Sequence, residues 1–417
     1  MTVLITGADG YLGWPTALRI ASQTTDRVVL VDNLARREWV ESVGSRSAVP
    51  IGGMAERLAA AEEVHGLRNL SFVEGDLTDR AVVDELLSVH EPETIVHTAA
   101  QPSAPYSQIN GERANYTQHN NLQATRNLLW GLEEHDLTDT HFIETTTTGV
   151  YGAPEFPIPE GGATMEHQGE RDEVPFPAMA GSWYHLTKSH DAANMRLAHN
   201  QFDIPVSDVR TAITYGTETA ETAADPRLAT RFDFDYYFGV VAHRFCAQAV
   251  AGYPMTVYGK GEQRKPFIAL EDAVEGLTQL ALSEPDTRPD NHVVYNQVTR
   301  AISIVELAET IADVAAEFDL DVAVKHFENP RDEDETHKME IENDRYADLI
   351  GGQSTTFKEG VQDILGTLVD YQSTVEAHED RFLPDVLAGD ASDEAVIEFD
   401  DAASEEEADA SATPEDE

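Results

Sequence analysis

Short apolar runs alternate with amphipathic segments along the first half of the chain. The apolar runs predict strands at Thr2–Thr6, Arg27–Val31, Leu70–Val73, Thr94–Thr98, Thr140–Glu144 and Pro205–Val209. Apolar residues that recur every three or four positions predict helices at Ala81–Val89, Asn121–Leu132 and Tyr184–Asn200, and another that begins near Gly13. Because alternating strands and helices form right-handed crossovers, we expect an α/β fold with a doubly wound parallel sheet.

The segment Leu34–Arg68 interrupts this alternation and is therefore read as an insertion, partly helical around Met54–Val64. We place a first domain at residues 1–208 and a smaller α/β domain mainly at residues 209–386, with some segments that return to the first. An acidic, disordered tail is expected at residues 387–417, because Asp390–Glu417 holds 13 acidic residues and no basic one.

The chain is strongly acidic throughout. Its 417 residues include 28 Lys plus Arg and 77 Asp plus Glu, a formal net charge of −49. This charge repels phosphate backbones and anionic lipid, so we expect no nucleic-acid or membrane partner. Lysine occurs at only six positions, and an acidic, lysine-poor surface resembles proteins of salt-loving cells. The alternative is an ordinary acidic protein with an acidic tail.

Cysteine usage and the first residues limit the class of protein further. A single cysteine, Cys246, cannot form an internal disulfide, and no Cys/His spacing suggests zinc, so we expect no metal. The chain starts directly with a predicted strand, without a basic segment followed by an apolar run. We therefore expect a soluble, cytoplasmic protein.

The first predicted turn between strand and helix carries three glycines, Gly7, Gly10 and Gly13. Such a turn lets a pyrophosphate approach the backbone at the amino end of a helix. Asp32, at the end of the second strand, is placed to accept hydrogen bonds from an adenine ribose. Together they predict a Rossmann domain that binds NAD. Arg36 and Arg37 suit a 2′-phosphate instead, which leaves NADP open.

Tyr184 and Lys188 stand four residues apart on one predicted helix face. A phenol has an ordinary pKa near 10. Positive charge from a lysine and an oxidised nicotinamide favours its ionised form, which makes it a base near neutrality. Thr147 supplies a hydroxyl at the carboxyl edge of the sheet, where such folds bind ligands. These three residues predict hydride chemistry at a carbinol.

Longer segments carry a resemblance. They include Gly10-Tyr-Leu-Gly-Trp14, Gln101-Pro-Ser-Ala-Pro-Tyr-Ser107, Tyr184-His-Leu-Thr-Lys-Ser-His-Asp191, Arg231-Phe-Asp-Phe-Asp235, Thr256-Val-Tyr-Gly-Lys-Gly261 and Asn329-Pro-Arg331. From residue 1 to about Pro384 the chain resembles the extended short-chain dehydrogenases/reductases that act on nucleotide sugars, and within them the UDP-sulfoquinovose synthases. Gln263-Arg-Lys-Pro-Phe267 is similar to their archaeal branch.

The resemblance implies a multistep reaction on UDP-glucose and sulfite. NAD oxidises C4, the 4-ketone acidifies the C5 proton, water leaves from C6, sulfite adds there, and C4 is reduced again. Tyr184, Thr147 and Lys188 would serve the C4 step. Where 4,6-dehydratases follow the threonine with Asp-Glu, this chain has Thr148-Gly149, so His185 is our candidate general acid at C6. A histidine that is merely packed beneath the sheet is the alternative.

The resemblance also implies binding residues. The cofactor set is Gly7, Gly10, Tyr11, Leu12, Gly13, Asp32, Asn33, Arg36, Asp76, Leu77, Asn121, Tyr184 and Lys188. The substrate set is Gln101, Thr147, Arg244, Val257, Lys260, Arg264, Lys265 and Arg331, with His337 as a weaker candidate. Asp76 is equally well explained as a helix cap. Which of Arg264 and Lys265 faces the diphosphate stays open, and Pro102 replaces an arginine of the plant-type synthases, which leaves the sulfite contact unassigned.

Two other functions use the same residues. A UDP-hexose 4-epimerase needs the threonine, the tyrosine, the lysine and NAD, but no chemistry at C6. A catalytically idle dinucleotide-binding regulator needs neither Tyr184 nor Lys188. Members of this family commonly pair through helices, so a homodimer is a further expectation.

Overall fold

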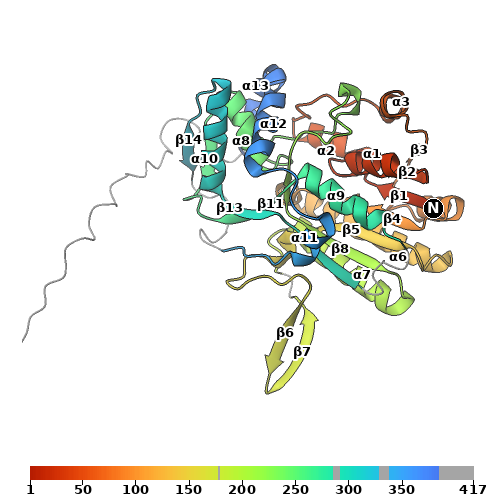
Figure 1. Ribbon diagram of the computed structural model, residues 1–417. Helices are drawn as coiled ribbons and strands as arrows, with labels where there is room; N and C mark the ends of the chain where they lie inside the picture. Colours follow the sequence, from red (N-terminus) through yellow and green to blue (C-terminus); the bar gives the residue numbers. More distant parts are fainter. Residues whose placement is uncertain (177–178, 285–291, 328–337, 385–417) are drawn as a thin grey trace, which may run out of the picture.

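A computed structural model describes residues 1–176, 179–284, 292–327 and 338–384. Its centre is a parallel seven-stranded sheet in the order β12-β8-β5-β4-β1-β2-β3. The bounds are β1 Thr2–Thr6, β2 Arg27–Asp32, β3 Leu70–Glu74, β4 Thr94–His97, β5 His141–Thr147, β8 Val206–Thr211 and β12 His292–Gln297. The predicted doubly wound parallel sheet is thus confirmed (Figure 1).

Helices cover both faces of this sheet because its strands are apolar on both sides. One face packs on α1 (Gly13–Gln23), α3 (Met54–His65) and α9 (Leu270–Ala281), with Val3 and Ile5 in that core. The other packs on α4 (Arg80–His90), α6 (Gly111–Glu134) and α7 (Trp183–Phe202), with Leu4 in that core. Successive residues of β1 therefore serve opposite layers.

The predicted elements are all present, with altered ends. β5 continues to Thr147, three residues beyond the predicted end, and α6 begins at Gly111, ten residues early. Within residues 1–208, four α-helices and strands were not predicted: α2 (Ala35–Ser42), α5 (Ala104–Ser107) and the hairpin of β6 (Gly162–His167) and β7 (Glu170–Pro175). The hairpin is almost entirely polar and projects from the body (Figure 1), so it lacks the apolar alternation that marks a buried strand.

A second α/β unit stands at the carboxyl edge of the sheet. It contains a three-stranded sheet of β9 (Ile213–Tyr215), β11 (Arg264–Ala269) and β13 (Arg300–Ser303), and a pair of β10 (Met255–Tyr258) and β14 (Val324–Phe327). Its helices are α8 (Val241–Val250), α10 (Ile304–Ala315), α12 (Phe357–Asp370) and α13 (Gln372–Glu376). Cys246 is buried in its core, next to Phe245. The short helix α11 (Asp344–Ile350) packs against α9 instead.

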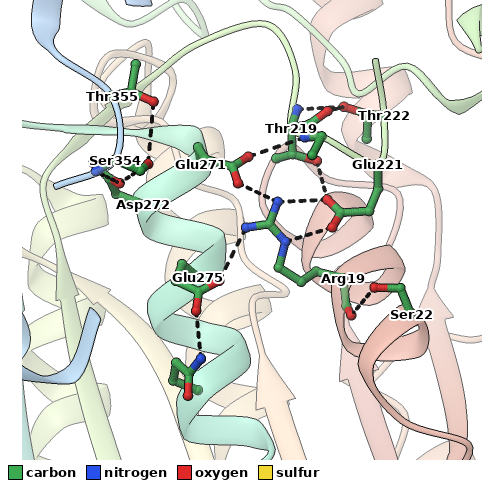
Figure 2. A network of polar contacts seen from close by, with 12 residues as sticks. Arg19, Ser22, Thr219, Glu221, Thr222, Glu271, Asp272, Glu275, Ser354 and Thr355 are labelled. Carbon is green, nitrogen blue, oxygen red and sulfur yellow. Dashed lines mark hydrogen bonds and ion pairs between the residues drawn. The ribbon is translucent and has the colours of Figure 1, made fainter. Parts of the chain in front are cut away.

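A buried arginine joins distant parts of the chain (Figure 2). Arg19 of α1 pairs with Glu221 at 2.8 Å, with Glu271 at 2.6 Å and with Glu275 at 3.4 Å, the last two on α9. The Arg19 side chain is only 5% exposed. Burial lowers the pKa of its guanidinium, but the carboxylates outweigh burial and raise it above its ordinary value. This cluster joins α9 to α1, the first helix of the chain. Because α9 directly follows β11, the ion pairs also hold the second unit against the first helix.

Two expectations lie outside the described residues. The acidic tail at 387–417 is one, and the substrate candidates Arg331 and His337 are the other. Within the ranges that the structure does describe, no helix is both long and apolar enough to cross a membrane.

Candidate active site

A cavity of about 770 Å³ lies between the sheet and the second unit. Its floor comes from the carboxyl ends of the strands: Gly7 after β1, Asp32 of β2, Thr98 after β4 and Thr147 of β5. Parallel strands end at one edge, so short side chains and backbone groups far apart in sequence meet there. The opposite wall includes residues of α8 and β11.

The glycine turn forms one end of this cavity. Gly7 has φ +73°, and a Cβ there would lie 2.6 Å from the backbone nitrogen of Ala99, so no other residue fits between β1 and β4. A Cβ on Gly13 would lie 2.2 Å from the Gly7 carbonyl oxygen. Three predicted cofactor residues of this turn, Gly10, Tyr11 and Leu12, also line the cavity. The turn thus exposes backbone at the amino end of α1, as a pyrophosphate requires.

Tyr11 connects this turn to the second unit. Its hydroxyl donates to the Gly216 carbonyl at 2.7 Å and lies 3.4 Å from Nε2 of His243. The same Nε2 accepts a hydrogen bond from the Gly216 backbone N–H at 3.2 Å. Burial lowers the pKa of His243 to about 4, so its imidazole is neutral near pH 7. Phe232 stacks on that ring at 4.0 Å.

Asp32 lies where an adenine ribose would be held. Its carboxylate accepts the backbone N–H of Asp9 at 2.9 Å and of Leu34 at 2.7 Å, which orients it towards the cavity. Burial raises its pKa, and the two backbone donors oppose that rise. Asn33, also predicted, lines the same wall.

Both arginines that suited a 2′-phosphate are bound by carboxylates. Arg36 pairs with Asp233 at 2.6 Å, and Arg37 pairs with Asp9 at 2.7 Å. Asp9 is fully buried and also holds Arg57 at 2.9 Å. A 2′-phosphate would have to displace a buried carboxylate from its partner, so these residues fit NAD better than NADP.

Asp76 and Leu77 line the cavity, and Asp76 is not the helix cap. Its Oδ1 accepts the Thr78 backbone N–H at 2.9 Å and the Thr78 hydroxyl at 2.8 Å. The cap of α4 is Asp79, whose side chain accepts from the Ala81 N–H. The alternative that Asp76 caps this helix is therefore wrong, because the capping residue is Asp79, three positions later.

Tyr184 and Lys188 both face the cavity from α7. α7 begins with a serine cap, because the Ser182 hydroxyl accepts the His185 N–H at 3.0 Å. Burial raises the pKa of Tyr184, while the ammonium of Lys188 lowers it. Burial outweighs the lysine in the protein alone, so the phenol is neutral there and ionises more readily only when further positive charge arrives.

Thr147, Gly149 and His185 form one small constellation. Thr147 ends β5, and its hydroxyl accepts the Gly149 N–H at 3.1 Å at the start of a short 3₁₀ turn, Thr148–Tyr151. The His185 ring lies against Gly149: a Cβ there would be 2.4 Å from Nε2. The Tyr184 and His185 ring centres are 5.2 Å apart. All four residues line the cavity, so His185 is not packed beneath the sheet.

Four predicted binding residues lie away from the cavity wall. Gln101 and Asn121 are buried behind it, where Asn121 Oδ1 accepts the Gln101 N–H at 2.8 Å and its amide donates to the Thr187 hydroxyl at 3.0 Å. Val257 points into the core, since side chains alternate along β10 and its neighbours Thr256 and Tyr258 take the cavity side. Lys260 is exposed in the turn after β10.

The same alternation separates Arg264 from Lys265 on β11. Lys265 lines the cavity together with Arg244 of α8. Arg264 lines a separate groove, pairs with Glu306 at 3.3 Å and donates to the Ala301 carbonyl. Of the two neighbours, Lys265 is thus the one placed for a diphosphate in the cavity.

Several cavity residues had no assigned role in the sequence, among them Arg231, Asp233 and Met179. Arg231 and Asp233 pair at 3.0 Å, and Asp233 also holds Arg36, so two arginines share one carboxylate on the wall. Met179 lines the wall near the 3₁₀ turn. Arg231 and Asp233 stand in a segment that carried the resemblance, but only folding shows that they meet Arg36. Among the described residues, no three His, Cys, Asp or Glu side chains gather as a metal site would need.

Comparisons with known proteins agree with this geometry. Residues 3–296 match the model of the NAD dependent epimerase/dehydratase family. The chain is 36% identical to UDP-sulfoquinovose synthase of Sulfolobus acidocaldarius, over 92% of this chain and 96% of that protein. It is also 36% identical to the chloroplastic UDP-sulfoquinovose synthase of Spinacia oleracea, over 83% of this chain and 71% of that protein.

A solved structure supports the fold. The UDP-glucuronic acid 4-epimerase of Bacillus cereus, in complex with UDP-glucuronic acid and NAD, superposes with a TM-score of 0.65 at 18% identity, covering 90% of this chain and all of that one. The chain belongs to the NAD dependent epimerase/dehydratase family and, within it, to the UDP-sulfoquinovose synthases.

Proposed function

We propose that this enzyme makes UDP-sulfoquinovose from UDP-glucose and sulfite, with NAD bound throughout the cycle. The observation that carries the proposal is the His185 ring against Gly149, in the place where 4,6-dehydratases hold an acidic pair. The two synthases at 36% identity support it. The His185 ring, from the neighbouring helix, thus fills the space that a side chain at position 149 would take.

The cofactor fits the cavity. The turn of Gly7, Gly10 and Gly13 would hold its pyrophosphate, and Asp32 would accept from its adenine ribose. When bound, NAD would supply a hydride acceptor for C4 of the hexose and, once reduced, the hydride donor that restores it. The added positive charge would act with Lys188 against the burial that keeps the Tyr184 phenol neutral.

Three side chains of this protein act at C4. Tyr184 removes the proton of the 4-hydroxyl and returns it in the last step. Thr147 orients that hydroxyl from the end of β5, and Lys188 stabilises the phenolate. The proton taken from the 4-hydroxyl in the first step is given back in the last, so the Tyr184 phenol ends the cycle in its starting protonation state.

His185 acts at C6. The 4-ketone makes the C5 proton acidic; the imidazole can take that proton and deliver it to the leaving 6-hydroxyl, so the elimination releases water with no net gain or loss of a proton. An imidazole is suited to give a proton near neutrality. Its ring is adjacent to Tyr184 and to the threonine turn, so one sugar ring can contact both.

Lys265 and Arg244 give the substrate end its positive charge. Both line the cavity of an otherwise acidic protein. A UDP-sugar carries two phosphate charges, which guanidinium and ammonium groups bind well. We assign the diphosphate to this wall.

The test measures products by mass. Protein purified in high salt is given UDP-glucose with and without sulfite, and nucleotide sugars are analysed. A sulfonate that appears only with sulfite supports the proposal, whereas UDP-galactose formed without sulfite would identify an epimerase. His185→Asn should lose sulfonate formation but keep C4 oxidation, while His190→Asn, exposed on the same helix, should behave as wild type.

We further propose a homodimer through α6 and α7. Trp130 on α6 is 50% exposed and Leu197 on α7 is 53% exposed, so this helix pair presents large apolar groups. Trp130→Ser with Leu197→Ser should convert a dimer to a monomer in light scattering. The acidic, lysine-poor composition supports adaptation to concentrated salt, which predicts a folded state that becomes more stable as KCl rises.

A further inference from the structure

A pair of buried carboxyl groups lies behind the proposed catalytic lysine. The Lys188 ammonium donates to Glu144 Oε1 at 2.9 Å and lies 3.7 Å from Asp191 Oδ2. Glu144 comes from β5 and Asp191 from the next turn of α7. Both carboxyl side chains are completely buried, and Lys188 is 2% exposed. The proposed mechanism uses the lysine but neither acid.

The charges in this cluster do not balance if both acids are ionised. Two carboxylates against one ammonium would leave a net negative charge in a completely buried region, which is costly. By distance and angle, Glu144 Oε2 and both oxygens of Asp191 have no hydrogen-bond donor among the described residues, although the Thr125 hydroxyl lies close enough to Asp191 to lower its pKa. One proton held between the two groups removes the excess charge and supplies the missing donor.

Among the described residues, His97 does not compensate the second charge. His97 of β4 is held between the hydroxyls of Thr6, at 2.7 Å, and Thr125, at 3.3 Å. Burial lowers the pKa of His97 well below its ordinary value, and the nearby Lys188 lowers it further, so the ring is neutral.

The adjacent strand β8 adds negative charge. Asp208 accepts from the Thr146 hydroxyl and from Arg210 Nε at 3.0 Å, so that arginine already has its own carboxylate. Asp208 raises the pKa of Glu144 in addition to burial. On the cavity side, Arg36 also lowers the pKa of Tyr184, and this arginine is itself paired with Asp233.

We propose that Glu144 and Asp191 share one proton and form a single-charged counter-ion that positions Lys188 beside Tyr184. Glu144 carries the negative charge because it receives the direct hydrogen bond from the ammonium. Asp191 carries the proton and donates it to Glu144. The lysine then remains charged and fixed, and the three groups together carry zero net charge.

This arrangement matters for the phenol. A second full negative charge near Tyr184 would hold back the phenolate, since Glu144 and Asp191 both raise the pKa of Tyr184. Burial raises the pKa of Asp191 well above its ordinary value, and Glu144 raises it further, which agrees with a proton on Asp191. The inference rests on the proposed function only for the role of Tyr184.

The first experiment reads the proton directly and needs no substrate. Infrared spectra of the folded protein are recorded near pH 7 for wild type, Asp191→Asn, Glu144→Gln and the control Asp272→Asn, a carboxylate that bonds to Ser354 in another part of the molecule. The band of a protonated buried carboxyl should be present in wild type and in the control. It should vanish in Asp191→Asn, where the remaining glutamate ionises, and in Glu144→Gln, where Asp191 must ionise to balance Lys188.

The second experiment reads the consequence for catalysis. Asparagine copies a protonated aspartate, so Asp191→Asn should leave the acid limb of its pH profile in place. If Asp191 were ionised in the wild type, its removal would move that limb to lower pH by about one to two units. The double variant, which lacks any counter-ion, should lose far more activity than the two single variants together.

Two outcomes would overturn the inference: a wild-type spectrum without the protonated-carboxyl band, or an acid limb that moves in Asp191→Asn. Failure of the proposed function looks different. In that case the band remains as described, and no sulfonate forms from UDP-glucose and sulfite.

Discussion

Substitution of Gly149 by alanine tests how His185 is placed. The added Cβ would lie 2.4 Å from His185 Nε2. Non-bonded heavy atoms prefer separations of about 3.5–4.0 Å, so the imidazole or the 3₁₀ turn must shift by about 1 Å. Overpacking of this kind costs about 1–3 kcal/mol in stability. A 1 Å misplacement of a reacting group reduces rates by roughly 100-fold.

The assay separates C4 oxidation from the later steps. With UDP-glucose alone, Gly149→Ala should still show the absorbance of reduced nicotinamide, since Tyr184 and Lys188 are not displaced by the new methyl group. With sulfite added, sulfonate formation should fall by about 100-fold. Gly111→Ala is the matched control, because a Cβ there meets nothing within 4 Å. Wild-type sulfonate formation by a folded Gly149→Ala protein would refute the assignment of His185.

Three other predictions concern binding and stability. Lys265→Ala should raise KM for the UDP-sugar by about tenfold or more, whereas Arg264→Ala should leave KM unchanged, as steady-state kinetics will show. His243 has a folded pKa of about 4 against an ordinary 6.5, so the neutral ring contributes about 3 kcal/mol of folding stability above pH 6.5. This contribution is lost as pH falls from 6.5 towards 4. Denaturant unfolding of His243→Gln, measured across this pH range, should lack that loss. Arg19→Gln should lower the unfolding free energy by about 3–5 kcal/mol, because it leaves three carboxylates without their buried partner. Calorimetry measures this loss, and Arg68→Gln, which removes an exposed ion pair with Glu62, is the control.

The local pattern of apolar and polar residues was enough to predict the central sheet and the helices that pack on its two faces. The apolar runs at β1, β2 and β4 are buried, and only strands packed on both faces need such runs. The glycine turn and the Tyr184/Lys188 pair were also readable, since each depends on residues within one turn or one helix. The polar hairpin β6–β7 was not readable, because nothing in its sequence alternates between core and solvent.

The residues of the site divide in the same way. Val257 and Gln101 stand in segments typical of the family, but strand alternation turns Val257 into the core and Asn121 holds Gln101 behind the wall. Lys265 and Arg264 are adjacent and chemically similar, so only the pairing of β11 with β13 decides which enters the cavity.

By itself, the sequence predicted the fold class, a dinucleotide cofactor and the proposed catalytic tyrosine and lysine, because these follow from short-range periodicity and spacing. Tertiary structure alone decided that His185 occupies the space above Gly149 and that Glu144 reaches Lys188 from a different element. Those contacts join β5 to α7, and their distances depend on how the sheet packs against its helix. Whether Glu144 and Asp191 can share one proton likewise depends on the distance between them in space, and their positions in the sequence do not fix that distance.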